Sequence, residues 1–162
     1  MLILAKKQYQ LNFEKLMQIY AESNRDNAEL MHQEVSLEQG ILRVEESFRQ
    51  YLTEVFFPTP GAVYAIWAEG DAYISALRLE PYEDGLLLEA LETAPEHRRE
   101  GYAEKLIRAV QAEFPQTIYS HVSKKNTASL KVHQKCGFSQ ALDYAKYIDG
   151  SVVRNAVTLQ YR

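Results

Sequence analysis

Residues 98–103, Arg-Arg-Glu-Gly-Tyr-Ala, place two arginines and a glycine where an apolar, strand-like run meets an amphipathic helical pattern. A glycine at such a junction lets backbone N–H groups face outward without a Cβ in the way. The first turn of the following helix carries unpaired N–H donors and a partial positive charge. With the guanidinium groups of Arg98 and Arg99, this turn predicts a cradle for a diphosphate-bearing ligand. The pattern alone is also typical of a solvated helix start.

A second motif follows another strand-like run, residues 117–123. Residues 126–138 read Asn-Thr-Ala-Ser-Leu-Lys-Val-His-Gln-Lys-Cys-Gly-Phe. Asn126 has the side chain of a helix N-cap, and Gly137 is typical of the residue that ends a helix. The sequence therefore predicts two strand–helix units in succession, with chemistry at the start of the first helix.

Together the two motifs resemble the GNAT superfamily of acyl-CoA-dependent N-acyltransferases. Arg98, Gly101 and Ala103 match the family's pyrophosphate pattern, in which Arg or Gln precedes Gly by three residues and Gly or Ala by five. The resemblance covers the chain from about Val63 to its C-terminus, and the motifs lie in the family's order. The first sixty residues are compatible with the family but carry no signature.

The second motif resembles the family's later helix and departs from it at one position. Asn126, Ser129, Gly137 and Phe138 fit, whereas His133 stands where the family usually has tyrosine. The family's tyrosine is thought to protonate the departing CoA thiolate. An imidazolium could do the same, because its pKa of about 6.5 makes it a stronger acid than a phenol. The last turn of a helix favours that protonated form; the alternative is a histidine that caps the helix or packs.

The resemblance implies acetyl-CoA as co-substrate, direct transfer of acetyl to an amine, and no metal. The pantetheine arm is expected to pair with free backbone groups at about Leu91–Thr93, in the strand at residues 86–93, where an N–H can also face the thioester carbonyl. The implied donor-binding residues are Leu91, Glu92, Thr93, Arg98, Arg99, Glu100, Gly101, Tyr102, Ala103, Asn126, Ser129 and His133. A catalytically silent acetyl-CoA-binding sensor or regulatory module is the alternative function.

Two acids on the strand at residues 86–93 are candidates for the base that takes the amine proton, Glu89 and Glu92. Successive strand residues face opposite ways, so both can face one side only if a bulge intervenes. We favour Glu89, which lies deeper in the strand; a structural partner for an arginine is the alternative. Tyr144, with Tyr147, is a reserve acid for the thiolate.

Other polar residues are less informative. His97 is expected to pack at the arginine turn, and His121 could line the gap beside its strand, although a strand-surface role is favoured. Cys136 is expected to be a small buried apolar residue rather than a nucleophile. Lys124 and Lys125 could meet a CoA phosphate or could simply be solvated.

The acceptor is indicated only by charge. Between Glu22 and Glu46, five acidic residues face two arginines as fixed cations. They are Asp26, Glu29, Glu34, Glu38 and Glu45, against Arg25 and Arg43. Such a bias attracts a cationic amine, although a solvated helix face gives the same pattern. We expect a small-molecule or peptide amine as acceptor.

The elements that position these residues follow from hydrophobic periodicity. Strands are expected at residues 2–5, 62–68, 72–79, 86–93, 117–123, 139–148 and 152–161, the last two as one hairpin around Asp149-Gly150. Helices are expected near residues 13–20, after the capping box at 36–39, and at 102–114 and 127–136. The helix after the capping box is expected to carry one apolar stripe that ends with Val55 and Phe56. Residues 25–29 are polar and are expected to form a loop or a fraying end. The result is an α/β fold, a mixed and mostly antiparallel sheet of about seven strands with a central parallel pair and helices on both faces. The resemblance implies that this parallel pair is splayed.

Composition sets the remaining expectations. The 162 residues correspond to one domain, 1–162, with 46% hydrophobic and 25% charged residues. The net charge of −4 argues against general nucleic-acid binding. One cysteine fits a reducing compartment, no run reaches membrane-spanning length, and residues 1–6 do not read as a signal peptide. We therefore expect a cytoplasmic protein without nucleic-acid or membrane partners; the resemblance allows a homodimer.

Overall fold

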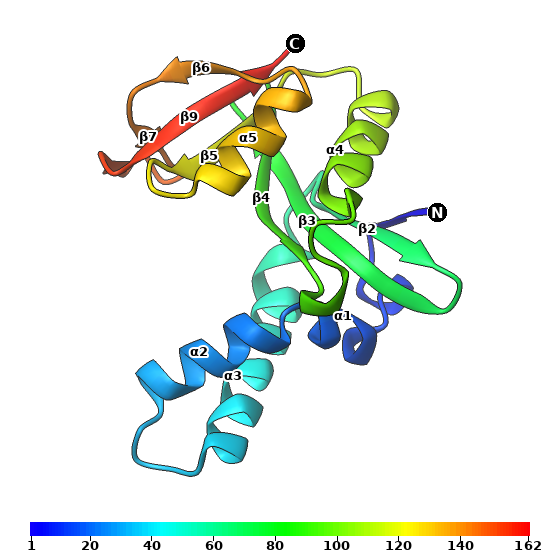
Figure 1. Cartoon of the computed structure of the whole chain (residues 1–162), viewed down its shortest axis with the longest axis vertical. Coiled ribbons are helices and arrows are strands. Elements are labelled where there is room, and N and C mark those ends of the chain that lie inside the picture. Colours follow the sequence, from blue (N-terminus) through cyan, green and yellow to red (C-terminus); the bar gives the residue numbers. More distant parts are fainter.

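The computed structural model describes residues 1–162 and is built on a seven-stranded sheet (Figure 1). In spatial order the strands are β1 (Leu2–Ala5), β2 (Val63–Glu69), β3 (Ala72–Tyr82), β4 (Gly85–Thr93), β5 (Ile118–Ser123), β9 (Ala156–Tyr161) and β6 (Ser139–Leu142). Only β4 and β5 run parallel, because helix α4 (Tyr102–Glu113) crosses over between them. This confirms the expected mixed, mostly antiparallel sheet with a central parallel pair.

Helices cover both faces of the sheet and divide the core in two. One core contains α1 (Phe13–Ile19), α3 (Leu37–Tyr51) and the π-helical turn Leu52–Phe56, packed on β1, β2 and β3. The other contains α4 (Tyr102–Glu113) and α5 (Thr127–Lys135) on the opposite face. Helix α2 (Ala21–Met31) pairs with α3, and the two project together from the sheet (Figure 1). Short 3-10 turns lie at Gln8–Gln10 and Pro95–His97.

The parallel pair is tight at its start and then opens. A Cβ on Gly85 would lie 1.9 Å from the carbonyl oxygen of Thr117, so only glycine permits this approach. The pairing continues through Leu86–Ile118 and Leu87–Tyr119 and ends at Leu88–Ser120. Because β4 continues to Thr93 and β5 to Ser123, the two strands diverge after Leu88, as expected for a splayed pair.

A bulge in β4 lies where the strands diverge. Opposite β4, Arg78 pairs with Glu89 and Ala76 pairs with Glu92, so two β4 residues face the single β3 residue between them. Ala90, one of these two, has a positive φ of 52°. The bulge shifts the alternation of side chains by one residue in the second half of β4.

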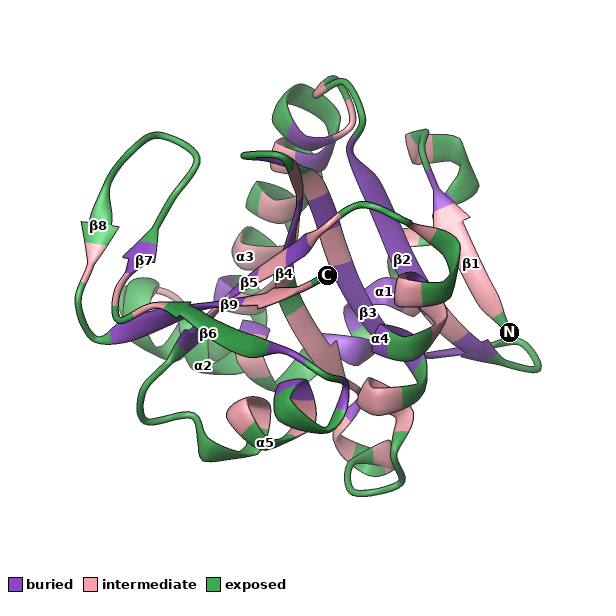
Figure 2. Ribbon diagram, turned by 90° about the horizontal axis from the view of Figure 1, so that it is seen from above, coloured by how far each residue is buried: buried purple, intermediate pink, exposed green.

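Three expectations about local structure were wrong. Residues 25–29 belong to α2, whose polar sequence buries only Asn24 and Ala28 and so lacks an apolar stripe. The helix after the capping box does not continue regularly to Phe56, because the π-helical turn rotates its face and leaves Val55 53% exposed. The expected last hairpin is split between two ladders, since β6 pairs with β9, whereas β7 (Ala145–Lys146) pairs with β8 (Val152–Val153). This small second ladder projects beside the main sheet (Figure 2).

Candidate active site

The turn before α4 presents backbone donors without partners. Gly101 is the N-cap, with φ of 83°, and no side chain caps the helix. The first N–H of α4 with a partner belongs to Lys105, which donates to the Gly101 carbonyl at 3.0 Å. The N–H groups of Tyr102, Ala103 and Glu104 are therefore free, as an anion site at a helix N-terminus requires.

Arg98 approaches this turn but is engaged elsewhere. Its Nη1 lies 3.1 Å from each carboxylate oxygen of Glu22, on α2. Both side chains are about half exposed, so the pair is weakly stabilising. A phosphate at the α4 terminus would compete with Glu22 for the guanidinium. Arg99 adjoins it, with a positive φ of 64°, and Glu100 lies 3.3 Å from His97 Nδ1.

A cavity of about 570 Å³ opens where β4 leaves β5. We call it the gap cavity; β4 contributes residues 87–90, β5 His121, β3 Arg78, and the segment after β7 residues 147–149. Glu89 and His121 directly follow the last paired residues, Leu88 and Ser120, so they stand on the two diverging strands. This volume lies within the range of about 300–1,000 Å³ that is typical of small-molecule sites.

The Glu89 carboxyl has an environment that suits proton transfer. Burial, followed by a hydrogen bond and charge repulsion from Glu80, raises the pKa of Glu89 to about 8, and Arg78 opposes this rise. Arg78 Nε lies 3.9 Å from Glu89 Oε2. A group that titrates near neutrality in a cavity is well suited to act as a general base.

Glu92 is on the same face as Glu89 but is not a lining residue of the gap cavity. On β3, Ala76 pairs with Glu92 and Arg78 pairs with Glu89. Since these two β3 residues are two positions apart, they and their partners point to the same face of the sheet. The bulge that is needed for both glutamates to face one side of the sheet is therefore present. Burial raises the pKa of Glu92, whose Oε2 accepts a hydrogen bond from Ser23 Oγ at 3.2 Å.

The raised pKa of Glu89 gives a stability prediction. Since the ordinary glutamate pKa is about 4.3, the folded protein retains a proton that the unfolded chain releases between about pH 4 and pH 8. Wild-type stability therefore falls as the pH rises through this window. Glu89→Gln cannot ionise, so we expect its stability relative to wild type to be greater at about pH 9 than at about pH 4. Each unit by which folding raises the Glu89 pKa contributes about 1.4 kcal/mol, so the difference should exceed about 1 kcal/mol, or roughly 2–4 °C. Thermal unfolding at both pH values measures this, and an equal difference at both would contradict it.

His133 is 1% exposed, and both of its ring nitrogens are engaged. Nε2 lies 2.8 Å from Ser120 Oγ, and Nδ1 lies 2.7 Å from the Ser129 carbonyl oxygen. This pattern fits a neutral ring that donates from Nδ1 and accepts at Nε2. Burial lowers the pKa of His133, a shift opposite to the one expected from the helix end. To act on a thiolate, the ring would have to leave both partners.

From this position we expect His133→Phe to lower stability by about 1–3 kcal/mol, because the buried Ser120 hydroxyl loses its partner. Phenylalanine preserves the ring packing on Phe138, whose centroid lies 5.0 Å away. At a temperature where the variant is folded, we expect turnover to be retained. Denaturant unfolding and a rate assay together check this, with His32→Phe, a partly exposed histidine, as control. Unchanged stability with lost turnover would instead support a general acid.

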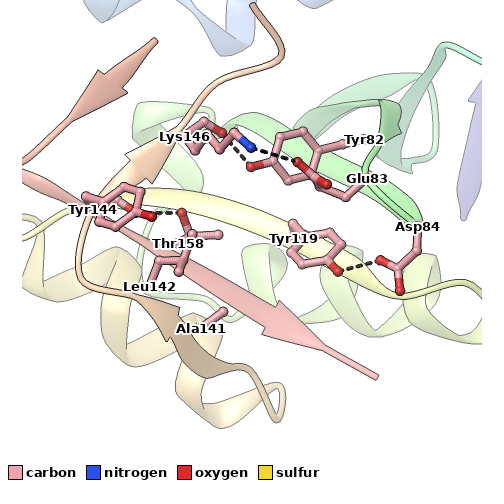
Figure 3. A pocket seen from close by; sticks show the side chains of 9 residues that line it. All are labelled: Tyr82, Glu83, Asp84, Tyr119, Ala141, Leu142, Tyr144, Lys146 and Thr158. Carbon is pink, nitrogen blue, oxygen red and sulfur yellow. Dashed lines mark hydrogen bonds and ion pairs between the residues drawn. The ribbon is translucent and has the colours of Figure 1, made fainter. Parts of the chain in front are cut away.

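Tyr144 lies in a different cavity from Glu89. This second cavity, of about 390 Å³, is formed by the β3–β4 turn, β5, β6, β7 and β9 (Figure 3). Tyr119 donates to Asp84 there, and the Tyr144 carbonyl accepts from Thr158 Oγ1 at 2.7 Å. The reserve acid that does line the gap cavity is Tyr147, whose ring centroid is 4.9 Å from that of His121.

Two residues of the gap cavity were missed or set aside at the level of sequence. His121 has a buried Nε2 with no hydrogen-bond partner, and burial lowers its pKa. Arg78 belongs to no sequence motif, and it reaches the site because it pairs with Glu89 across the β3–β4 ladder, next to the bulge. His121 was set aside as a strand-surface residue, and it reaches the cavity because β5 leaves β4 directly before it, after Ser120.

The second motif forms a helix start rather than a visible binding surface. The Asn126 side chain accepts from the Ser129 N–H at 3.1 Å and caps α5, as its type predicted. Leu91 and Thr93 lie on β4 beyond its pairing with β5. Lys124 Nζ is 3.2 Å from Asp143, while Lys125 is exposed.

The acidic bias near the N-terminus does not reach the gap cavity. None of its five acids lines that cavity. Glu29 pairs with Arg25, and Glu34 pairs with Arg43 at 2.7 Å. These acids lie on or beside the projecting α2 and α3, so they give no direct support for a cationic acceptor.

No group of three His, Cys, Asp or Glu side chains is arranged to bind a metal ion. None of the helices combines the length and apolar character needed to cross a bilayer.

Cys136 is buried, and burial raises the pKa of its thiol. A buried thiol with a raised pKa is a poor nucleophile, as expected for a small apolar core residue.

Solved structures with this architecture include several acetyltransferases. PaiA N-acetyltransferase from Thermoplasma acidophilum, in complex with coenzyme A, superposes with a TM-score of 0.66 at 12% identity, over 100% of this chain and 99% of that one. Spermidine N-acetyltransferase from Vibrio cholerae gives 0.60 at 16% identity, over 99% and 93%. An acetyltransferase from Elizabethkingia anophelis with acetyl-CoA bound gives 0.56 at 16% identity, over 72% and 82%. At these identities the likeness concerns the fold.

Sequence comparison supplies the family. No curated protein matches the chain in sequence. The model of the acetyltransferase (GNAT) family matches residues 14–138, which include the free helix terminus, the bulged strand and all of the second motif. The chain therefore belongs to the GNAT acetyltransferase family.

Proposed function

We propose that the protein is an N-acetyltransferase that moves acetyl from acetyl-CoA directly to a primary amine. The divergence of β4 from β5 after Leu88 carries this proposal, because it creates the gap cavity beside free β4 backbone groups. The unpartnered N–H groups of α4 and the Glu89 carboxyl are the two chemical features that a donor and an acceptor need.

On the donor side, the diphosphate binds the N–H groups of Tyr102, Ala103 and Glu104, and Arg98 exchanges Glu22 for phosphate. The pantetheine arm extends along β4 at residues 91–93, whose side facing β5 has no strand partner. This binding mode places the thioester at the divergence of the strands. That the family's solved relatives include CoA and acetyl-CoA complexes supports it.

On the acceptor side, the amine enters the gap cavity beside Glu89. Its nitrogen attacks the thioester carbon as Glu89 accepts a proton, and the C–S bond then breaks to release CoA thiolate. A β4 backbone N–H stabilises the oxyanion. The proton taken by Glu89 equals the one that the thiolate finally binds, so the step balances without a further acid. If a separate donor operates, Tyr147 is the phenol at the cavity; His133 would need to rotate, and Tyr144 to cross from the second cavity.

A thiol-release assay with acetyl-CoA and a panel of amines tests the proposal. We expect CoA release that depends on the amine and becomes faster as the pH rises through about 8, the pKa of Glu89. Binding of acetyl-CoA without release in the presence of any amine would contradict it and would favour a sensor module. The panel should contain polyamines, because a solved relative is a spermidine N-acetyltransferase, as well as amino acids and peptides.

A further inference from the structure

The gap cavity contains a buried cation whose Nε has no hydrogen-bond partner. Arg78, on β3, reaches between the sheet and α3, where its Cζ lies 5.2 Å from the Tyr51 ring centroid and 5.7 Å from that of Phe48. Its side chain is 17% exposed, and its Nε is buried without a partner. The Glu89 carboxylate, 3.9 Å from Nε, is too distant for a hydrogen bond. Buried donors normally have partners, so this guanidinium has unused capacity.

The acids around the cavity leave that capacity unfilled. The Glu89 pKa of about 8 keeps its carboxyl mostly protonated at neutral pH. Asp149 lines the cavity but is exposed and already accepts from the Ser151 N–H at 2.9 Å and from Ser151 Oγ at 2.6 Å. Tyr20 and Tyr64, which lie close enough to raise the pKa of Arg78, hydrogen-bond each other at 2.6 Å. An anionic group in the ligand would supply the missing partner.

The spacing between Arg78 and Glu89 restricts where that anion lies in the acceptor. Because Arg78 Nε lies only 3.9 Å from Glu89 Oε2, ligand groups that contact the exposed part of the guanidinium and the Glu89 carboxyl must be close neighbours. An α-amino acid carries its amine and its carboxylate on one carbon, so it can present the nitrogen to Glu89 and an oxygen to Arg78. A polyamine has no anion to offer there, and a second ammonium beside Arg78 would be repelled.

The rest of the cavity wall suits an apolar substituent. Leu87, Leu88, Ala90, Tyr147 and Ile148 make up five of its nine lining residues. Leu87 and Leu88 are almost fully buried, whereas Tyr147 and Ile148 are 39% and 55% exposed, on the segment between β7 and β8. Covering the two exposed side chains with an apolar group would be favourable.

We propose that the acceptor is a free α-amino acid with an apolar side chain, whose carboxylate pairs with Arg78 while its amine faces Glu89. The proposal rests on the acetyl transfer proposed above and names the substrate class for it. A peptide N-terminus offers Arg78 only an uncharged carbonyl at the corresponding position. A simple alkylamine has no hydrogen-bond acceptor for Arg78 at this position.

Three matched acceptors test this on the wild-type protein: leucine, leucinamide and isopentylamine. They share the amine and the apolar group and differ in having a carboxylate, a neutral carbonyl or neither. We expect kcat/KM for leucine to exceed that for isopentylamine by about tenfold to a hundredfold, the usual effect of a hydrogen bond to a charged group. Equal rates for leucine and leucinamide would show that the acceptor carboxylate is not recognised, and would point to a peptide N-terminus as acceptor. Equal rates for leucine and isopentylamine would show that Arg78 has no role in recognising the acceptor. If other amines react but leucine and phenylalanine do not, the inference fails and the acetyltransferase stands; if no amine reacts, both fail.

Arg78→Met provides the second readout, because methionine keeps much of the apolar contact with Tyr51 and Phe48 but loses the charge. Loss of Arg78 also removes the charge that opposes the rise in the Glu89 pKa, so both acceptors should lose some activity, and isopentylamine measures that shared loss. We expect kcat/KM for leucine to fall about tenfold or more beyond the fall for isopentylamine, through a higher KM. Arg49→Met is the matched control, since Arg49 also lies over a ring, that of Phe13 at 3.9 Å, but outside the cavity. If Arg78→Met remains folded and loses activity equally on both acceptors, Arg78 serves Glu89 rather than the substrate, and the proposal is wrong.

Discussion

Glu89→Gln should reduce turnover by about 10²–10⁴-fold, the usual cost of removing a general base. Glutamine is nearly the same size and keeps a hydrogen-bonding group toward Glu80 and Arg78, but it accepts no proton. Because Glu89 lies at the gap cavity and not at the α4 terminus, acetyl-CoA affinity should remain close to wild type. Steady-state rates combined with calorimetric binding of acetyl-CoA separate the two effects.

The pH dependence makes this result specific to proton transfer. Wild-type kcat/KM should rise with pH through about 8, as Glu89 loses its proton and becomes a base. The loss in Glu89→Gln should shrink at higher pH, where a growing fraction of the amine is already neutral. Glu92→Gln is the matched control, since Glu92 lies on the same face of the same strand but outside the cavity. If Glu92→Gln shows the pH-dependent loss and Glu89→Gln does not, the base is Glu92.

Gly101→Val should weaken acetyl-CoA binding by about tenfold or more, or about 1.4 kcal/mol. Its φ of 83° is unfavourable for a β-branched residue, and a side chain there would stand beside the N–H groups that we propose bind the diphosphate. A Cβ at this position meets no atom within 4 Å, so the loss would not arise from a clash in the unliganded fold. Gly70→Val is the matched control, because Gly70 also has a positive φ, 57°, and open space but lies in the β2–β3 turn.

Arg98→Glu should have a similar effect through charge alone, since it replaces a cation beside the phosphates with an anion. Glu22→Gln distinguishes this from the loss of the ion pair: it frees Arg98 and should leave binding unchanged or tighter. Calorimetry on folded variants measures all four proteins. If both Gly101→Val and Arg98→Glu bind acetyl-CoA with wild-type affinity, the diphosphate does not bind at this turn.

The part of the fold that the sequence predicted best is the part with strong local signals. The apolar run before the arginine turn, the amphipathic stripe of α4 and the Gly-Phe corner after α5 identified the strands and helices around the proposed donor site. Helix α2 was missed because its polar residues bury only Asn24 and Ala28 and it is held largely by α3. The last hairpin was missed as two ladders because the break near Asp143 carries no glycine or proline.

The site was predictable to the same degree. Glu89 and the helix terminus at Gly101 could be found from strand parity and turn chemistry. Arg78 and His121 could not, because their relation to Glu89 depends on the β4 bulge and on the residue at which β5 diverges. His133 shows the opposite difficulty: its position in the motif suggested an acid, whereas tertiary packing against Ser120 gives it two hydrogen bonds and a lowered pKa.

Direct acetyl transfer can be followed in a single turnover with isotopically labelled acetyl-CoA, with enzyme in excess and leucine or another accepted amine present. We expect the label to appear on the amine, CoA to be released in equal amount, and the intact mass of the protein to be unchanged, because the buried Cys136 takes no part. Label retained on the protein, label recovered as acetate, or acetyl-CoA that stays bound and intact with every amine would contradict direct transfer at the divergence of β4 and β5.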